Sequence, residues 1–198
     1  GYIAGVGDYS GIEEVDVRGK YLAPGFIDGH LHIESTMLSP SNFAKAIMPW
    51  GTTTGICDPH EIANVCGEAG VDYMIRESKQ TPFDAVFMAP SCVPATPYEN
   101  NGATIDAKGV DRLLDKCHGV GEFMNAPGVV YGDKDVLNKL KCAKNRGVVV
   151  DGHYPMASAK ELNAYIGAGI STDHECTDIV DACDKIRRGM YVLIREGS

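Results

Sequence analysis

The chain has 198 residues, of which 44% are hydrophobic and 23% are charged, so it can bury a core and is neither collagen-like nor intrinsically disordered. Its 27 acidic and 18 basic residues give a net charge of −9 without a basic run, which disfavours a nucleic-acid partner. No apolar stretch reaches the roughly 18 residues that a membrane span needs. The seven cysteines form no C-x-x-C pair, which indicates reduced thiols in a cytoplasmic protein.

Residues 1–20 differ from the rest of the chain. They are rich in turn formers and show β character without a helical pattern. We expect them to be the remnant of a small N-terminal β-sandwich module, followed by a main domain at 21–198.

From residue 21 onward, short apolar runs alternate with amphipathic segments. The expected strands cover 21–32, 52–59, 83–90, 120–124, 148–153, 170–175 and 190–196. The expected helices cover 39–51 (beginning at Ser39 or Ser41), 67–80, 107–117, 133–147, 158–169 and 177–189. This alternation, without a dinucleotide fingerprint, favours an α/β fold with a parallel (β/α) barrel over a doubly wound sheet. Loops are expected at 91–105 and 125–133, where a barrel handles its substrate.

A closed barrel has eight strands and typically about 250 residues. Because the pattern shows seven strands, we expect a (β/α)8 TIM-type barrel truncated after strand 7.

His30 and His32 form an H-x-H pair on the first expected strand. Side chains two residues apart on a strand point to the same side, so both imidazoles would face the barrel interior. On its own, this pair is explained better by two core histidines with satisfied hydrogen bonds than by a metal site.

Three further strands end in residues that bind metals, namely Glu122, His153 and His174. A Glu buried alone in an apolar strand costs several kcal/mol unless it is paired or bound to a cation. The carboxyl ends of barrel strands meet, so these side chains should converge with His30 and His32. The set predicts one or two divalent transition metals, with Glu122 as a bridging ligand.

The segment PGFIDGHLHIES (24–35) resembles the first-strand signature of the metal-dependent amidohydrolase superfamily. GTTTGICDPHEIANV, PSCVPATP, GEFMNAPGV, DGHYP, LNAYIGAGISTDHE and GMYVLIREGS resemble its bacterial adenine-deaminating branch, and the resemblance extends to the C-terminus. It implies a (β/α)8 barrel beside a small β-sandwich, with a binuclear centre of Mn²⁺ or Fe²⁺, or alternatively Zn²⁺. His30 and His32 would bind one metal, His153 and His174 the other, and Glu122 would bridge them.

The activity that the resemblance implies is hydrolytic deamination of adenine to hypoxanthine and ammonia by a metal-activated hydroxide. The substrate would be a small purine base, and a homo-oligomer is expected. The proton carrier of this superfamily is generally an Asp at the end of the eighth strand, which would lie beyond Ser198. We therefore expect the 198 residues alone to be inactive.

His60 and Glu61 follow the second strand and are the expected catalytic residues within the chain, orienting substrate or relaying protons. Asp58 either shares that role or caps the next helix. Glu34 either reaches the pocket or is a solvated loop acid.

Asp28, Asp151 and Asp173 precede expected ligands and could accept hydrogen bonds that fix imidazole tautomers. His118 is expected to be structural, and Cys57, Cys92 and Cys176 to be inert thiols.

Two other functions remain open: another amidohydrolase, such as a deacetylase or cyclic-amide hydrolase, and a non-catalytic barrel scaffold. Glu122 stands where many superfamily members carry a carboxylated lysine, which argues against the hydantoinase and dihydroorotase branch. The zinc nucleobase deaminases of the small α/β/α fold are excluded because the chain has no P-C-x-x-C motif.

Overall fold

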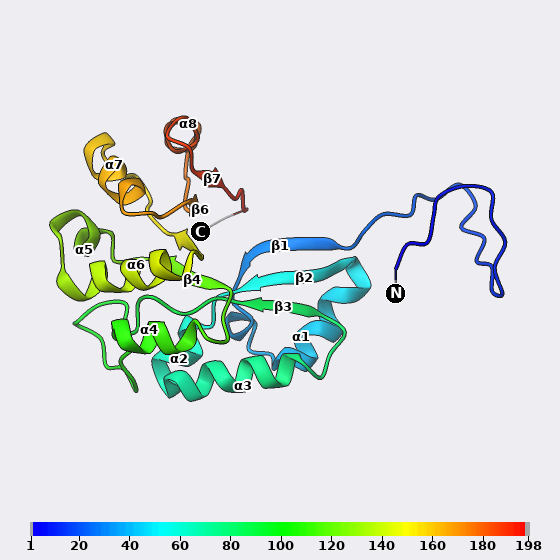
Figure 1. Ribbon diagram of the computed structural model, residues 1–198, viewed down its shortest axis with the longest axis horizontal. Coiled ribbons are helices and arrows are strands. Elements are labelled where there is room, and N and C mark those ends of the chain that lie inside the picture. Colours follow the sequence, from blue (N-terminus) through cyan, green and yellow to red (C-terminus); the bar gives the residue numbers. More distant parts are fainter. Residues whose placement is uncertain (1, 197–198) are drawn as a thin grey trace.

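The computed structural model describes residues 2–196, and its strands are parallel (Figure 1). One sheet contains β1 (Phe26–Leu31), β2 (Thr52–Cys57) and β3 (Asp84–Phe87). β4 (Gly119–Phe123) pairs with β5 (Val149–Gly152), and β6 (Thr172–Asp173) pairs with β7 (Tyr191–Val192). Every registered pair is parallel, as the alternation of strands and helices predicts.

Backbone contacts outside the ladders join these sheets in chain order. A parallel bridge between Ala89 and Val120 connects the end of β3 to β4. The N–H of Ser171 donates to the carbonyl of Val150 at 3.1 Å, which connects β5 to the start of β6. On the remaining side, a Cβ added to Gly29 of β1 would lie 2.4 Å from Cδ2 of Leu193, just after β7. The sheet therefore curves until its two outer strands approach each other.

Helices connect the strands, as the sequence predicts. The six expected helices are α1 (Pro40–Ile47), α3 (Glu68–Ser78), α4 (Ala107–Leu113), α6 (Lys134–Arg146), α7 (Ala159–Gly167) and α8 (Ile179–Arg187). Two short 3₁₀ turns, η1 (Glu34–Thr36) and η2 (Met48–Trp50), flank α1. Two more helices, α2 (His60–Cys66) and α5 (Ala126–Tyr131), were not expected. α5 occupies the expected loop 125–133, because the Asn125 side chain accepts from the Gly128 N–H and Pro127 occupies the first turn.

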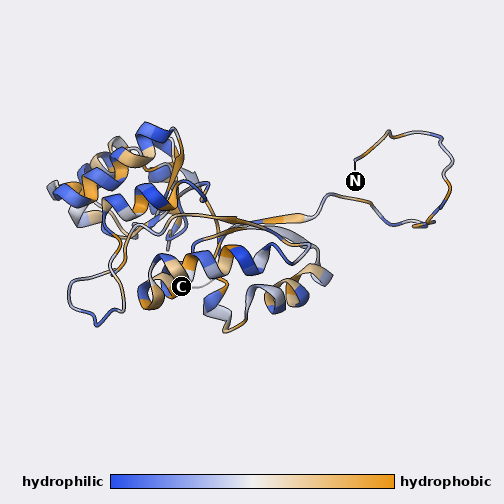
Figure 2. Cartoon of the chain, turned by 60° about the horizontal axis from the view of Figure 1, so that its bottom comes forward, coloured by the Kyte–Doolittle hydropathy of each residue, from blue (hydrophilic) through white to orange (hydrophobic). Residues whose placement is uncertain are grey.

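Local signals set the helix ends. Ser39 begins α1 by accepting from the N–H of Asn42, and Ser158 and Glu161 form a capping box at α7. Gly147 ends α6 with a φ of 65°, a conformation that glycine adopts without a Cβ penalty. Figure 2 shows hydrophilic and hydrophobic residues alternating along these helices, as expected when one face packs on the sheet.

The core lies between the helices and the sheet, and one of its members reaches the carboxyl ends of the strands. Tyr165 of α7 is fully buried, and its hydroxyl donates to the carbonyl of Phe123 at 2.6 Å. The same hydroxyl accepts from the backbone N–H of His153 at 2.9 Å. The core thereby fixes two strand ends that carry expected site residues.

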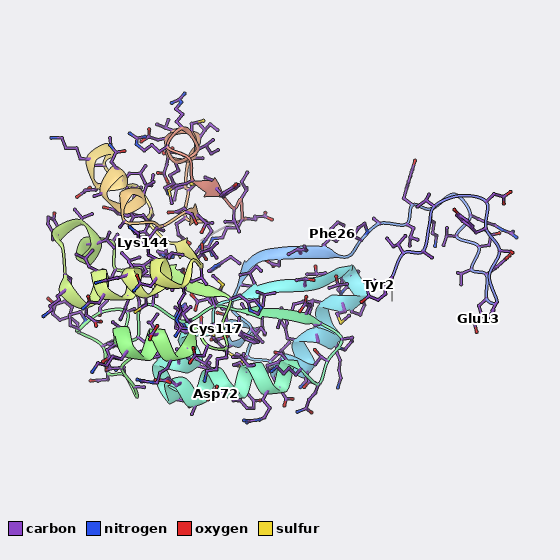
Figure 3. All side chains as sticks on the ribbon, viewed as in Figure 1. Tyr2, Glu13, Phe26, Asp72, Cys117 and Lys144 are labelled. Carbon is purple, nitrogen blue, oxygen red and sulfur yellow. The ribbon has the colours of Figure 1, made fainter. Side chains whose placement is uncertain are left out.

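Residues 2–25 form an exposed arm without helix or strand, and Figure 3 shows Glu13 at the far end of this arm, away from the body of the molecule. The first strand begins at Phe26, so the expected start at residue 21 is wrong. Pro24 has no N–H to donate, and registered pairing with β2 begins only at Phe26. The expected β-sandwich module at 1–20 stays a prediction.

Within residues 2–196, no helix combines the length and the apolar character that crossing a membrane requires.

Candidate metal centre

Glu122 of β4 is the centre of the candidate site, with 3% of its surface exposed. Five of the six histidines place a ring nitrogen near its carboxylate. On the Oε1 side, the distances are 2.8 Å to His60 Nε2 and 3.4 Å to His32 Nε2. On the Oε2 side, they are 2.7 Å to His153 Nδ1, 3.1 Å to His174 Nε2 and 3.9 Å to His30 Nε2.

The structure thus brings together all five residues expected to bind metal. Two triads of ligand atoms, each within 4.8 Å, share Glu122: one adds His30 and His32, and the other adds His153 and His174. Buried nitrogen and carboxylate donors in this number suit a divalent metal. The residues present therefore fit such an ion.

A third group within the same distance contains His30, Asp151 and His174. We interpret Asp151 as a partner of His30, because its Oδ2 lies 2.7 Å from His30 Nδ1. That contact leaves His30 Nε2 facing His32 Nε2 at 3.0 Å. Thr172 and the N–H of Gly152 bind the other oxygen of Asp151 and hold it in place. Asp151 therefore orients an imidazole, as expected of a carboxylate beside a metal ligand.

The charges of the site depend on Glu122. Burial alone would raise its pKa, but hydrogen bonds from His153, His174 and His60 hold that pKa well below the usual value. Burial would lower the pKa of His60, yet its bond to Glu122 and the charge of Asp58 raise it to about 9.

The other imidazoles respond to their own surroundings. Burial lowers the pKa of His32, whereas for His30 and His153 the nearby carboxylates outweigh burial and raise the pKa. The rings of His30 and His174 stack with centroids 3.8 Å apart. The two candidate triads therefore lie side by side.

Asp58 does not cap α2, since Pro59 occupies the cap position without a side-chain hydrogen bond. Asp58 is 1% exposed, and its Oδ2 accepts from the backbone N–H of Glu122 at 2.8 Å. Burial raises the pKa of Asp58 to about 7. The interpretation as a helix cap is wrong because the strand end directs this side chain inward to β4.

The two other acids near β2 lie around α2. Glu61 accepts a hydrogen bond from the Ser35 hydroxyl, and Glu34 accepts from the N–H of Ile62 at 3.2 Å. Burial raises the pKa of Glu34, which is not a freely solvated acid. Of the two expected catalytic residues, His60 contacts Glu122 and Glu61 contacts η1.

Asp28 and Asp173 bind backbone groups but, unlike Asp151, no imidazole among the described residues. Asp28 accepts from the N–H of His30 at 3.1 Å, and Asp173 accepts from the N–H groups of Tyr154 and Glu175. They fix the strand ends that carry expected ligands.

Two buried residues near the site were missed at the sequence level. Glu175 Oε1 lies 3.7 Å from His174 Nε2, and Glu175 also pairs with Arg195. Ser91 donates to the carbonyl of Glu122 at 2.7 Å. The position of Glu175 directly after His174 was a usable signal, but Ser91 lies in a loop without periodicity.

His118 and the cysteines lie apart from this chemistry. His118 lines a hollow of about 610 Å³ with Phe83 and Asp84, at the amino end of β3. Cys57 and Cys92 are buried, and burial raises the pKa of both thiols. Both findings fit the expected structural roles.

The family model described as the amidohydrolase family matches residues 21–196. The chain belongs to the amidohydrolase family. Membership of this family implies a TIM-type barrel, and the parallel strands in chain order agree with it.

Curated relatives extend the comparison. The chain is 54% identical to a protein of Clostridium acetobutylicum named adenine deaminase, over 99% of this chain and 35% of the relative. It is 53% identical to adenine deaminase 2 of Desulfotalea psychrophila and 50% identical to adenine deaminase of Methanoculleus marisnigri, covering 35% and 38% of their lengths. The chain therefore spans little more than a third of these relatives.

Among solved structures, an uncharacterized protein superposes with a TM-score of 0.51 at 15% sequence identity. The match covers 90% of this chain and 54% of the other. At this identity the likeness concerns the fold alone.

Proposed function

We propose that the chain carries the metal-binding part of an enzyme that hydrolyses adenine to hypoxanthine and ammonia. The observation that carries the proposal is the pair of metal triads sharing Glu122. Relatives at 50–54% identity bear the name adenine deaminase, and this supports the choice of substrate.

The proposed centre is binuclear, with Mn²⁺ or Fe²⁺ and alternatively Zn²⁺. His30 and His32 would hold one ion, His153 and His174 the other, and Glu122 would bridge them. When bound, the metal supplies a water of lowered pKa, so that hydroxide is available near neutral pH. The reaction forms a C–O bond and breaks the C–N bond at C6, while a proton passes to the departing amino group.

His60 and Glu61 are the proposed proton-handling or substrate-orienting residues of this chain. With a pKa of about 9, His60 holds a proton near neutral pH and presents a donor beside Glu122. Glu61 offers a carboxylate near η1, where it can accept a hydrogen bond.

We also propose that the barrel includes an eighth strand, with its proton-carrying Asp, outside these 198 residues. The much greater length of the relatives supports this. The way β1 meets the end of the sheet supports it too. The Leu193 side chain, just after β7, approaches Gly29 of β1, but the described residues form no strand ladder between β1 and β7. A β-sandwich module including 1–20 and a homo-oligomer belong to the same proposal.

The test uses the chain in place of the matching segment of the Clostridium acetobutylicum relative, alongside the 198 residues alone. Both proteins are stripped of metal, reloaded with Mn²⁺ and given adenine, and hypoxanthine and ammonia are measured. We expect equal amounts of the two products from the grafted protein and none from the short chain.

A cyclic amide and an N-acetylated amine serve as competing substrates. Turnover of either of them, with none of adenine by the metal-loaded grafted protein, would reject adenine as the substrate. A folded protein that binds no Mn²⁺ would reject the metal-binding role itself.

A further inference from the structure

The backbone of Glu122 lies at an irregularity in the sheet. The register between β4 and β5 shifts between Val120 and Phe123, so the ladder does not continue regularly through residues 121–122. The N–H of Gly121 donates to the carbonyl of Ala89, on the side of β3, at 2.8 Å. The peptide groups of Glu122 are therefore available to partners other than the neighbouring strand.

A side chain from β2 binds the N–H of Glu122. Asp58 Oδ2 accepts this hydrogen bond at 2.8 Å, and both residues are almost completely buried. The approach needs a glycine next to Glu122, because a Cβ on Gly121 would lie 2.2 Å from that oxygen. The structure thus combines a buried acceptor with the small residue that admits it.

A side chain from the loop after β3 binds the other end of the residue. The Ser91 hydroxyl, on a residue 2% exposed, donates to the carbonyl of Glu122 at 2.7 Å. The loop is itself held by Lys139 of α6, whose Nζ donates to the carbonyl of Ser91 at 2.9 Å. A buried ammonium needs its hydrogen-bond acceptor, so this contact holds Ser91 in place more firmly than a contact on the surface would.

We propose that Asp58 and Ser91 are positioning residues. Asp58 holds the backbone N–H of Glu122 and Ser91 holds its carbonyl, so that the carboxylate faces both histidine pairs. This rests on the metal-bridging role proposed for Glu122. A bridging carboxylate must hold both oxygens in place at once, and small displacements of such a group cost much of its function. Two side-chain hydrogen bonds hold the peptide groups of Glu122, which a regular ladder of backbone hydrogen bonds holds elsewhere in the sheet.

The first test compares Asp58→Leu with Asp58→Asn in the metal-free chain titrated with Mn²⁺. Leu has similar size but accepts no hydrogen bond, whereas the amide oxygen of Asn still accepts from Glu122. We expect D58L to weaken Mn²⁺ binding about 10–100-fold, the usual effect of losing a residue behind a ligand. D58N should stay within about threefold of the wild type, since the acceptor is kept.

The second test removes a hydroxyl. Ser91→Ala should weaken Mn²⁺ binding about tenfold or more. Ser78→Ala is the matched control, because Ser78 is 5% exposed and its hydroxyl has no hydrogen-bond partner among the described residues. S78A should bind Mn²⁺ like the wild type.

Hydrogen exchange of the Glu122 amide in the metal-free protein supplies a readout that is independent of metal. D58L should accelerate exchange at this amide, with smaller changes at β2 amides remote from Asp58. If D58L fails to fold, S91A and D58N carry the test.

Wild-type Mn²⁺ affinity in both D58L and S91A would overturn the proposal. Equal losses in D58L and D58N would also overturn it for Asp58, because charge and not hydrogen bonding would then matter. Mn²⁺ binding by the grafted protein without adenine turnover would count against the proposed function alone. If even the wild type bound no Mn²⁺, exchange at Glu122 would still decide whether Asp58 holds it.

Discussion

Glu122 stabilises the metal-free site only as long as its imidazole neighbours carry protons. A buried carboxylate without compensation costs several kcal/mol. The raised pKa values of His60 and His153 show that Glu122 favours their charged forms. Histidine binds metal only when neutral, so a bound cation replaces these protons in balancing Glu122. Protons and metal ions therefore compete for the same carboxylate and rings.

Replacing His153 by Asn tests this competition at a single ligand. His153 is partly exposed at the end of β5, so its loss should affect the site much more than the fold. We expect H153N to lower affinity for Mn²⁺ by at least the 10–100-fold that losing a residue behind a ligand costs. Bound metal should fall by about one ion per chain, measured by elemental analysis and chelator competition.

His118→Asn is the matched control, because His118 lies at the opposite end of the strands. H118N should retain wild-type metal content. If H153N bound metal like the wild type, His153 would not belong to the metal set.

At the scale of elements, α8 is tied to the strand before His174 by a buried ion pair. Lys185 has no exposed surface, and its Nζ lies 3.3 Å from Asp173 and 2.9 Å from Asp181. Asp173 is also fully buried and accepts two backbone hydrogen bonds next to the site. Removing the ammonium would leave this carboxylate without a cation.

Lys185→Met should therefore lower the free energy of unfolding by about 3–5 kcal/mol, the usual effect of breaking a buried pair from one side. Lys116→Met is the control, because Lys116 pairs with Asp72 on the surface and should contribute at most about 1 kcal/mol. Urea unfolding of the metal-free proteins measures both. Equal losses in the two variants would show that burial gives the Lys185 pair no special weight.

The elements that sequence predicts correctly are those with a clear period or cap. A capping serine predicts where α1 begins, the amphipathic pattern predicts α7, and the apolar runs predict the strands. α2 is missed because it has seven residues and no capping side chain, whereas the equally short α4 begins after the capping Asp106. α5 is missed because it begins with an Asn-x-Pro-Gly sequence, which is typical of turns.

In the candidate site, too, sequence predicts some features and misses others. The five expected ligands converge because the carboxyl ends of parallel strands meet, a rule that depends only on chain order. The contacts of Asp58 and Ser91 with Glu122 depend on a register shift at Gly121, which leaves no mark in the pattern of apolar residues. Sequence thus identifies which side chains meet, but not which groups hold them.

For the whole molecule, the proposed ligands come from strands that belong to different ladders. β1 supplies His30, β4 supplies Glu122, and the residues directly after β1, β5 and β6 supply His32, His153 and His174. Ions bound to the two triads that share Glu122 would connect sheets that are otherwise joined by few backbone contacts. Metal binding should therefore stabilise the fold as well as create the site.

Linkage gives the size of this effect. Metal at 100 times its Kd stabilises the folded state by about 2.7 kcal/mol, which for a chain of this size raises Tm by about 5–11 °C. Calorimetry of the metal-free chain with added Mn²⁺ should show this rise, and H118N should show it in full. H153N should show less at the same Mn²⁺ concentration, because its weaker affinity reduces the ratio of metal to Kd. A Tm that does not move with Mn²⁺ in the wild type would mean that metal binds the folded and unfolded chains equally, which ligands drawn from separate strands do not permit.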